Sequence, residues 1–198
     1  MNNYVYIIAG LPVISSGQNL PEGVTAEGII EQIKSQCSRK DCEVIDFLLS
    51  GFKDENLNEE FYRKALSHNS GFIREYFRFD LNLRNAKVRY INESLDRPEN
   101  MDIMDVDGGV FEEKDKASEI LHGIDILERE RGLDDLSWEK INGMTIFNYF
   151  DMTVILAFIA KLNIIDRWLR LDEERGRELF RNLVNEVRGT FKGVEFNA

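Results

Sequence analysis

The sequence has few of the residues that interrupt helices or build disulfide frameworks. It contains three prolines, the last of them Pro98, and two cysteines, Cys37 and Cys42. Two cysteines without Cys-x-x-Cys spacing exclude a disulfide framework and a multi-cysteine zinc site. We therefore expect both cysteines to be packing residues in a reducing compartment. Because proline is the strongest helix breaker, we expect the part of the chain after Pro98 to be helical.

Basic residues are also in short supply, with 25 Lys and Arg against 36 Asp and Glu and a net charge of -11. Nucleic acid is bound chiefly by an excess of Lys and Arg, so this balance argues against a nucleic-acid partner. The most apolar stretch, residues 152–160, is shorter than the roughly 20 residues that cross a bilayer. The N-terminus has no basic region typical of a secretory signal. The sequence thus predicts a cytoplasmic protein without a direct membrane span.

Motifs of catalysis and cofactor binding are missing as well. The sequence has no glycine-rich phosphate loop, no dinucleotide fingerprint and no serine nucleophile elbow. His68 and His122 do not form a metal-binding pair in sequence. The acidic stretch 102–107 resembles a calcium loop, but Val110 stands where a loop beginning at Asp105 needs glycine. We expect no cofactor, no metal and no catalytic site; a small helical metal-dependent enzyme is the weakest alternative.

Helical spacing of apolar residues predicts a mainly α fold, a helical bundle of about seven to eight helices. Residues 4–9 fit either a short N-terminal strand or a helical turn. Start and stop signals predict helices after Thr25, from Ser38 to Gly51, and from a cap at Asn56. The remaining expected helices lie at 71–95, 117–132, 137–143 and 145–170, and a last one begins after Asp172.

Residues 96–115 differ from the chain on either side, because they gather Pro98, Gly108, Gly109 and many acids. We expect this stretch to be an acidic linker between an N-terminal helical lobe, residues 1–95, and a C-terminal helical lobe, residues 116–198. The alternative is that both lobes pack as one domain.

The helix expected at 71–95 carries charge within its apolar arc, at Asp80, Arg84 and Lys87. A buried charge without a partner costs several kcal/mol. These side chains should therefore neutralise one another at i,i+3 and i,i+4 spacing, or meet opposite charge elsewhere. Alternatively, Arg84 and Lys87 lay their alkyl stems along the core and reach water at its edge. In each arrangement Asp80, Arg84 and Lys87 have a structural role.

The helix expected at 145–170 is apolar on all sides in its middle, so neighbours must surround it. Its end is different, because Asn163, Asp166, Arg167 and Arg170 gather on one side. This return to an amphipathic pattern predicts that the helix leaves the core there.

Residues 75–89, Glu-Tyr-Phe-Arg-Phe-Asp-Leu-Asn-Leu-Arg-Asn-Ala-Lys-Val-Arg, resemble the hallmark helix of the C/d subunit family of V-type/A-type ATPases and ATP synthases. The matching positions are Asp80, Leu81, Asn82, Leu83, Arg84 and Lys87. A second copy is similar at Leu162-Asn163-Ile164, followed by Asp166 and Arg167. The opening Tyr-Ile-Ile-Ala-Gly-Leu-Pro, residues 6–12, is similar to an uncharacterised bacterial family found among V-type ATPase genes, which stands in for the C/d family.

The resemblance implies a non-catalytic coupling subunit of an ATPase that transports protons or another ion. Such a subunit sits on the cytoplasmic face of the membrane rotor ring and receives the central shaft. Its partners are then the shaft and ring subunits, and it is peripheral to the inner membrane through the complex. A helical protein–protein adaptor of another assembly is the alternative.

Overall fold

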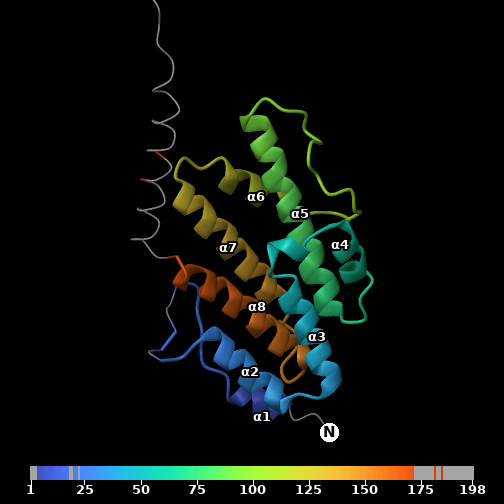
Figure 1. Ribbon diagram of the computed structural model, residues 1–198, viewed down its shortest axis with the longest axis vertical. Helices are drawn as coiled ribbons and strands as arrows, with labels where there is room; N and C mark the ends of the chain where they lie inside the picture. Colours follow the sequence, from blue (N-terminus) through green and yellow to red (C-terminus); the bar gives the residue numbers. More distant parts are fainter. Residues whose placement is uncertain (1–3, 18–19, 22, 172–180, 182–183, 185–198) are drawn as a thin grey trace, which may run out of the picture.

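The computed structural model describes residues 4–17, 20–21, 23–171, 181 and 184. The described residues form eight α-helices and one 3-10 turn, with no strand among them, which confirms the predicted helical bundle (Figure 1). The helices are α1 (Tyr4–Ala9), α2 (Ala26–Gln36), α3 (Arg39–Ser50), α4 (Glu59–Leu66), α5 (Gly71–Ser94), α6 (Lys114–Leu121), α7 (Ile126–Gly143) and α8 (Met152–Leu169), and the 3-10 turn is Asp54–Asn56. The helix predicted after Asp172 falls almost wholly outside the described residues.

The first helices begin where local capping signals predict them. Residues 4–9 form helix α1, the second of the two alternatives for this segment. The Thr25 side chain accepts a hydrogen bond from the Gly28 N–H, and α2 follows. Ser38 and Asp41 form a reciprocal capping box at the start of α3, which ends at Gly51 as predicted.

The cap predicted at Asn56 is wrong by two residues. Asn58 is the cap of α4, and its side chain accepts a 2.9 Å hydrogen bond from the Phe61 N–H. The Asn56 amide instead donates to the Ser50 carbonyl, which closes the turn after α3. Both residues have cap chemistry, so spacing alone does not separate them.

Three boundaries in the C-terminal half also differ from prediction. The segment 117–143 forms α6 and then α7, which Asp125 caps. Helix α7 runs unbroken through Gly132, where a Cβ would lie 2.9 Å from Ile120 of α6. This glycine thus serves a close approach of two helices. Helix α8 begins at Met152 rather than near Thr145, because Asp151 accepts the Thr153 and Val154 N–H groups.

Two apolar clusters stabilise the fold. The larger lies around α8, whose Ile155, Leu156, Ile159 and Leu162 are almost fully buried among α1, α2, α3 and the first half of α5. The burial of these residues confirms the prediction that neighbouring helices surround the apolar middle of α8. The smaller cluster joins α5, α6 and α7, and its buried residues are Phe79, Leu83, Ala117, Leu121, Leu133 and Leu136.

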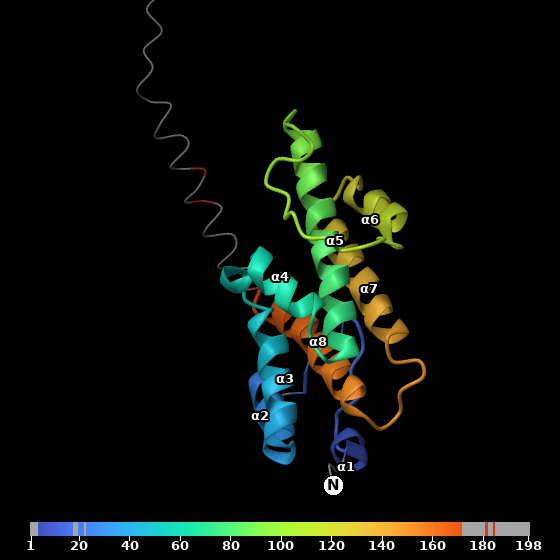
Figure 2. The ribbon, with the colours of Figure 1, turned by 90° about the vertical axis from the view of Figure 1, so that its right-hand side faces the viewer.

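Helix α5 belongs to both clusters, and Figure 2 shows it extending from the lower group of helices to the upper one. Helices from both predicted lobes contribute to each cluster, since α8 packs with α1–α3 and α5 packs with α6. The lobe boundary at residues 96–115 stays a prediction. Among the described residues, no helix combines the length and apolarity needed to cross a bilayer.

The acidic segment after α5 is held against that helix by three asparagines. The Asn92 amide donates to the Glu99 and Met101 carbonyls. Asn85 donates to the Met104 carbonyl and accepts from the Met104 N–H, and Asn82 donates to the Gly108 carbonyl at 3.1 Å. The segment therefore returns along α5 with its backbone fixed at each step. We call these residues, Asn82, Asn85 and Asn92, the asparagine ladder.

Candidate functional site

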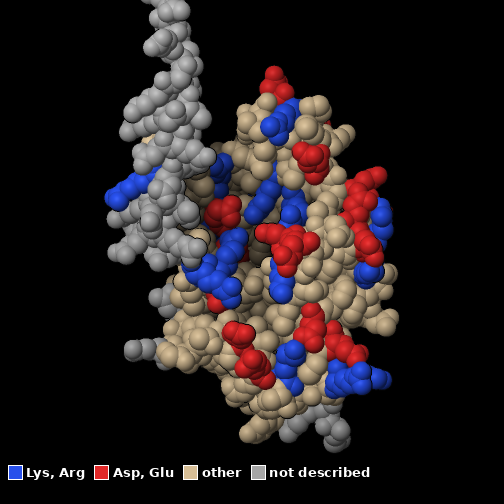
Figure 3. Space-filling view, in the orientation of Figure 1, with Lys and Arg blue, Asp and Glu red and all other residues tan. Residues whose placement is uncertain are grey.

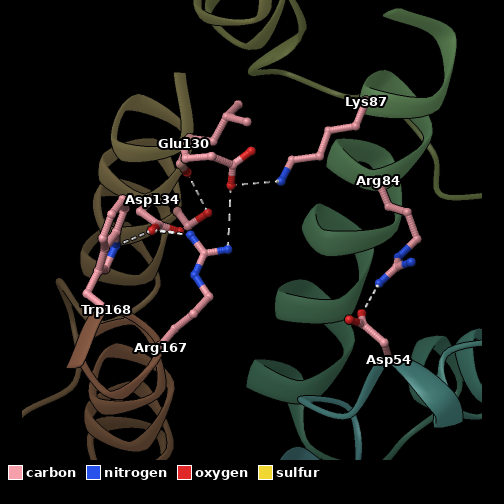
Figure 4. A network of polar contacts seen from close by, with 9 residues as sticks. Asp54, Arg84, Lys87, Glu130, Asp134, Arg167 and Trp168 are labelled. Atoms are coloured by element: carbon pink, nitrogen blue, oxygen red, sulfur yellow. Dashed lines mark hydrogen bonds and ion pairs between the residues drawn. The ribbon is translucent and has the colours of Figure 1, made fainter. Parts of the chain in front are cut away.

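Charged residues predicted on two distant helices meet across α7. The Lys87 ammonium of α5 lies 4.0 Å from the Glu130 carboxylate, which lies 3.7 Å from the Arg167 guanidinium of α8. Arg167 also forms an ion pair with Asp134, one turn after Glu130 (Figure 4). Glu130 of α7 thus joins α5 to α8, and Asp134 adds a second pair to α8. We call Lys87, Glu130, Asp134, Arg167 and Trp168 the interhelical charge network.

The inner end of the network is the Asp134 carboxylate, whose side chain is only 14% exposed. The Trp168 indole donates a 2.7 Å hydrogen bond to it. Burial raises the pKa of the Asp134 carboxyl, and the nearby Arg167 guanidinium and the Trp168 hydrogen bond act in the opposite direction. The Arg131 guanidinium lies 5.0 Å from the centre of the Trp168 ring, at cation–π distance. These contacts fix the end of α8 to α7.

Asp80 lies beside this network but pairs with a hydroxyl. The Tyr62 hydroxyl, on a fully buried side chain of α4, donates a 2.5 Å hydrogen bond to the Asp80 carboxylate. Burial raises the pKa of Asp80, while Tyr62, Arg84 and Lys87 act to lower it. The same burial and the Asp80 charge raise the pKa of Tyr62. Asp80 therefore ties α4 to α5.

Arg84 and Lys87 of α5 find their ion partners on other elements. The Arg84 guanidinium lies 2.9 Å from Asp54 in the 3-10 turn, and its side chain is 33% exposed. Lys87, similarly half-buried, reaches Glu130. The structure thus combines two of the expected arrangements, because each stem lies along the core and each head meets an opposite charge at its edge. Figure 3 shows Lys and Arg facing Asp and Glu around a hollow in this part of the surface.

The remaining predicted residues lie outside the network. Asn82 belongs to the asparagine ladder, and a Cβ on Gly108 would come within 2.7 Å of its side-chain oxygen. Asp166 forms a 2.6 Å ion pair with Arg170, the residue that caps the end of α8. Asn163 is half-buried on the same helix. Sequence reasoning therefore identified Lys87 and Arg167 but missed Glu130, Asp134 and Trp168, which only helix packing brings to them.

Two polar groups of the acidic stretch 102–107 bond to other groups of the protein. The Asp105 N–H donates to the Glu59 carboxylate, and the Asp107 carboxylate accepts from the Gly109 N–H at 2.8 Å. In the part of the chain that the structure describes, no three His, Cys, Asp or Glu side chains gather in a way that could hold a metal ion.

A second candidate feature is the loop between α7 and α8, which exposes large apolar side chains. Ile146, Phe147, Tyr149 and Phe150 are 61%, 90%, 72% and 58% exposed. The loop is nonetheless ordered, since Asn148 bonds to Thr145 through its backbone and to Asp151 through its side chain. Contiguous exposed apolar residues mark interaction sites on soluble domains. We call residues 146–150 the aromatic loop. Sequence reasoning missed it because these residues were expected inside a helix.

Residues 108–190 match the model of a family described as a protein of unknown function, DUF2764. The chain is similar to that family over this range. Over 221 aligned residues it is 26% identical to an uncharacterised protein of Chlamydia pneumoniae, an alignment that covers 94% of this chain and 80% of the relative. No solved structure matches the chain. The range similar to DUF2764 includes the aromatic loop and the α7 and α8 members of the interhelical charge network.

Proposed function

We propose that this protein is a non-catalytic subunit of a V-type/A-type ATPase that couples the central rotor shaft to the membrane ring during ion transport. In this role it is cytoplasmic and peripheral to the inner membrane, and the complex holds it there. The proposal begins with the resemblance of residues 75–89 and 162–167 to helices of the C/d subunit family.

One structural observation carries the proposal. The two helices with these motifs, α5 and α8, are far apart in sequence, and Glu130 of α7 links them by pairing with both Lys87 and Arg167. Asp134 adds a second ion pair between α7 and Arg167. A part that transmits torque must resist shear between its helices. Close packing and interhelical ion pairs supply such resistance, because packed interiors have low compressibility.

The aromatic loop supports the same role from the outside. A coupling subunit works by binding other proteins, and protein interfaces are enriched in exposed aromatic side chains such as Phe147 and Tyr149. The loop is part of neither apolar cluster, so its side chains are available to a partner. The alternative function, a helical adaptor of another assembly, rests on this loop alone.

Affinity purification tests the proposal. We expect the tagged full chain, purified from membranes of its native host, to bring down shaft and ring subunits of the ATPase. Changing Phe147, Tyr149 and Phe150 together to Ser should remove these subunits from the preparation. The matched control changes Ile124, Ile126 and Leu127 to Ser, since these apolar side chains are also exposed but lie just before and at the start of α7.

Three results would separate the alternatives. A preparation without ATPase subunits rejects the coupling function, and subunits of a different complex in their place favour the adaptor. If the control triple variant loses the ATPase subunits and the loop variant keeps them, the binding surface lies at the α6–α7 turn.

A further inference from the structure

A cavity of about 730 Å³ lies between the second half of α5, the acidic segment and α6. Its volume falls in the range of about 300 to 1,000 Å³ that small-molecule sites occupy. None of the interhelical charge network residues line it. The cavity is therefore a separate feature from the network and from the aromatic loop.

One wall of this cavity is the acidic segment, which the asparagine ladder holds in place. Asn92 fixes the backbone at Glu99, and Asn82 fixes it at Gly108, next to the cavity residue Gly109. Gly109 has a φ of +66°, a left-handed conformation that glycine adopts without strain. The wall thus needs no rearrangement before a ligand enters, which lowers the entropic cost of binding.

The floor of the cavity is apolar and partly aromatic. Leu121 is buried there, and Tyr90 and Phe111 contribute rings. The Tyr90 hydroxyl accepts a hydrogen bond from Arg129, whose guanidinium also lies 5.4 Å from the ring centre. Phe111 packs 6.1 Å from Phe79, centre to centre. Because both rings are held by protein contacts, the floor can receive an aromatic ring of a ligand by stacking or edge contact.

The rim carries more positive than negative charge, against the net charge of -11 for the chain. Arg89, Arg97 and Lys114 line it, with Glu93 and Glu99 as the acids. Arg89 lies 3.9 Å from Glu99 in a largely exposed pair, which is weak. Within the described ranges, no acid forms an ion pair with Arg97 or Lys114. Arginine binds phosphate through paired N–H donors, and lysine binds it as a point charge.

We infer that this cavity binds a phosphorylated small molecule with an aromatic ring, the chemical class to which nucleotides belong. The ring lies on the floor beside Tyr90 and Phe111, and the phosphate meets Arg97 and Lys114. Glu93 and Glu99 accept hydrogen bonds from hydroxyl or amino groups of the ligand. Side-chain cations hold the phosphate here, in a sequence without a glycine-rich phosphate loop. The inference does not depend on the coupling function.

Calorimetric titration of the full chain tests this site, with ADP, adenosine and inorganic phosphate as probes. We expect ADP to bind more tightly than either of the other two. Lys114→Ala and Arg97→Ala should each raise the Kd for ADP by about tenfold, the loss of one charge-assisted contact. The matched control is Lys116→Ala, two residues further along α6, because Lys116 pairs with Glu139 and does not line the cavity. The Kd of the Lys116→Ala variant for ADP should equal that of the unchanged protein.

Several outcomes would overturn the inference. ADP that shows no binding, or that binds equally to both cavity variants and the unchanged protein, rejects the site. Phosphate that binds as tightly as ADP rejects the role of the aromatic floor. Unfolding curves of each variant accompany the titration, and Arg97 and Lys114 are both exposed, so we expect the fold to be unchanged.

Discussion

The Trp168 indole donates a hydrogen bond to the Asp134 carboxylate, so a half-buried ring and a nearly buried acid join α8 to α7. The same carboxylate pairs with Arg167. Asp134 thus receives two donors from neighbouring residues of one helix. Because burial raises the pKa of Asp134, removing either donor should make its charged form more costly.

We predict that Trp168→Phe lowers the free energy of unfolding by about 1–3 kcal/mol at neutral pH, the cost of leaving a buried polar group short of a partner. The loss should shrink as the pH falls through the folded-state pKa of Asp134, because the neutral carboxyl needs the donor less. Urea unfolding of the variant and the unchanged protein at several pH values measures this loss of free energy. Trp138→Phe is the control, since Trp138 contacts the Lys161 ammonium through its ring. Equal losses in both variants would contradict the role of the indole hydrogen bond.

Asp80 predicts a second pH dependence. Burial raises the pKa of Asp80 above its unfolded value, so the folded state binds more protons between the two pKa values. The free energy of unfolding should therefore fall as the pH rises through that window, and stay level above it. Asp80→Asn should flatten this decline, because its side-chain oxygen still accepts from Tyr62 and no longer titrates. In this variant the free energy of unfolding should still fall slightly with rising pH, because burial also raises the pKa of Asp134. An unchanged profile in Asp80→Asn would show that the carboxyl is not desolvated.

Two glycines predict opposite effects of alanine. A Cβ at Gly51 would collide with the Phe77 ring and come within 2.7 Å of Phe61 Cζ, whereas nothing lies within 4 Å of one at Gly143. Gly51→Ala should destabilise the protein by about 1–3 kcal/mol through overpacking. Gly143→Ala should stabilise it by about 0.5–1 kcal/mol through helix propensity. Thermal unfolding of both variants checks the pair, and a stabilised Gly51→Ala would mean that these rings move aside freely.

The asparagine ladder predicts a local effect on the acidic segment. Asn85→Ala removes two hydrogen bonds to Met104, so the free energy of unfolding should fall by about 1–3 kcal/mol. Amide hydrogen exchange should accelerate most at the Met104 N–H, which then lacks its acceptor. The control is Asn142→Ala, on the exposed face of α7. Exchange that rises equally along the whole chain would point to global loosening instead.

Local signals in the sequence predicted the helices well, because a cap depends on residues a few positions apart. Thr25 and Ser38 are correct for that reason. Gly132 misled the prediction, since its propensity suggests a helix end while its actual role is contact with Ile120. Asp151 before an apolar run was a usable cap signal that the prediction of a start near Thr145 left unused.

The candidate site was harder to predict, because its pairs join distant parts of the chain. The spacing of Asp80, Arg84 and Lys87 indicated charge in an apolar arc, but it could not name Tyr62 or Glu130 as partners. Those contacts depend on how helices pack, which periodicity does not determine. The cavity was also hidden, because its wall is a segment that composition marks as a linker.

Helix α5 has a mechanical consequence, since its 24 residues span about 36 Å and take part in both apolar clusters. Any rotation of one apolar cluster relative to the other would bend this continuous helix and stretch its backbone hydrogen bonds. The two clusters should accordingly melt in a single transition. The amides between Phe79 and Leu83, which lie where the clusters adjoin, should then exchange with solvent only when the whole molecule opens.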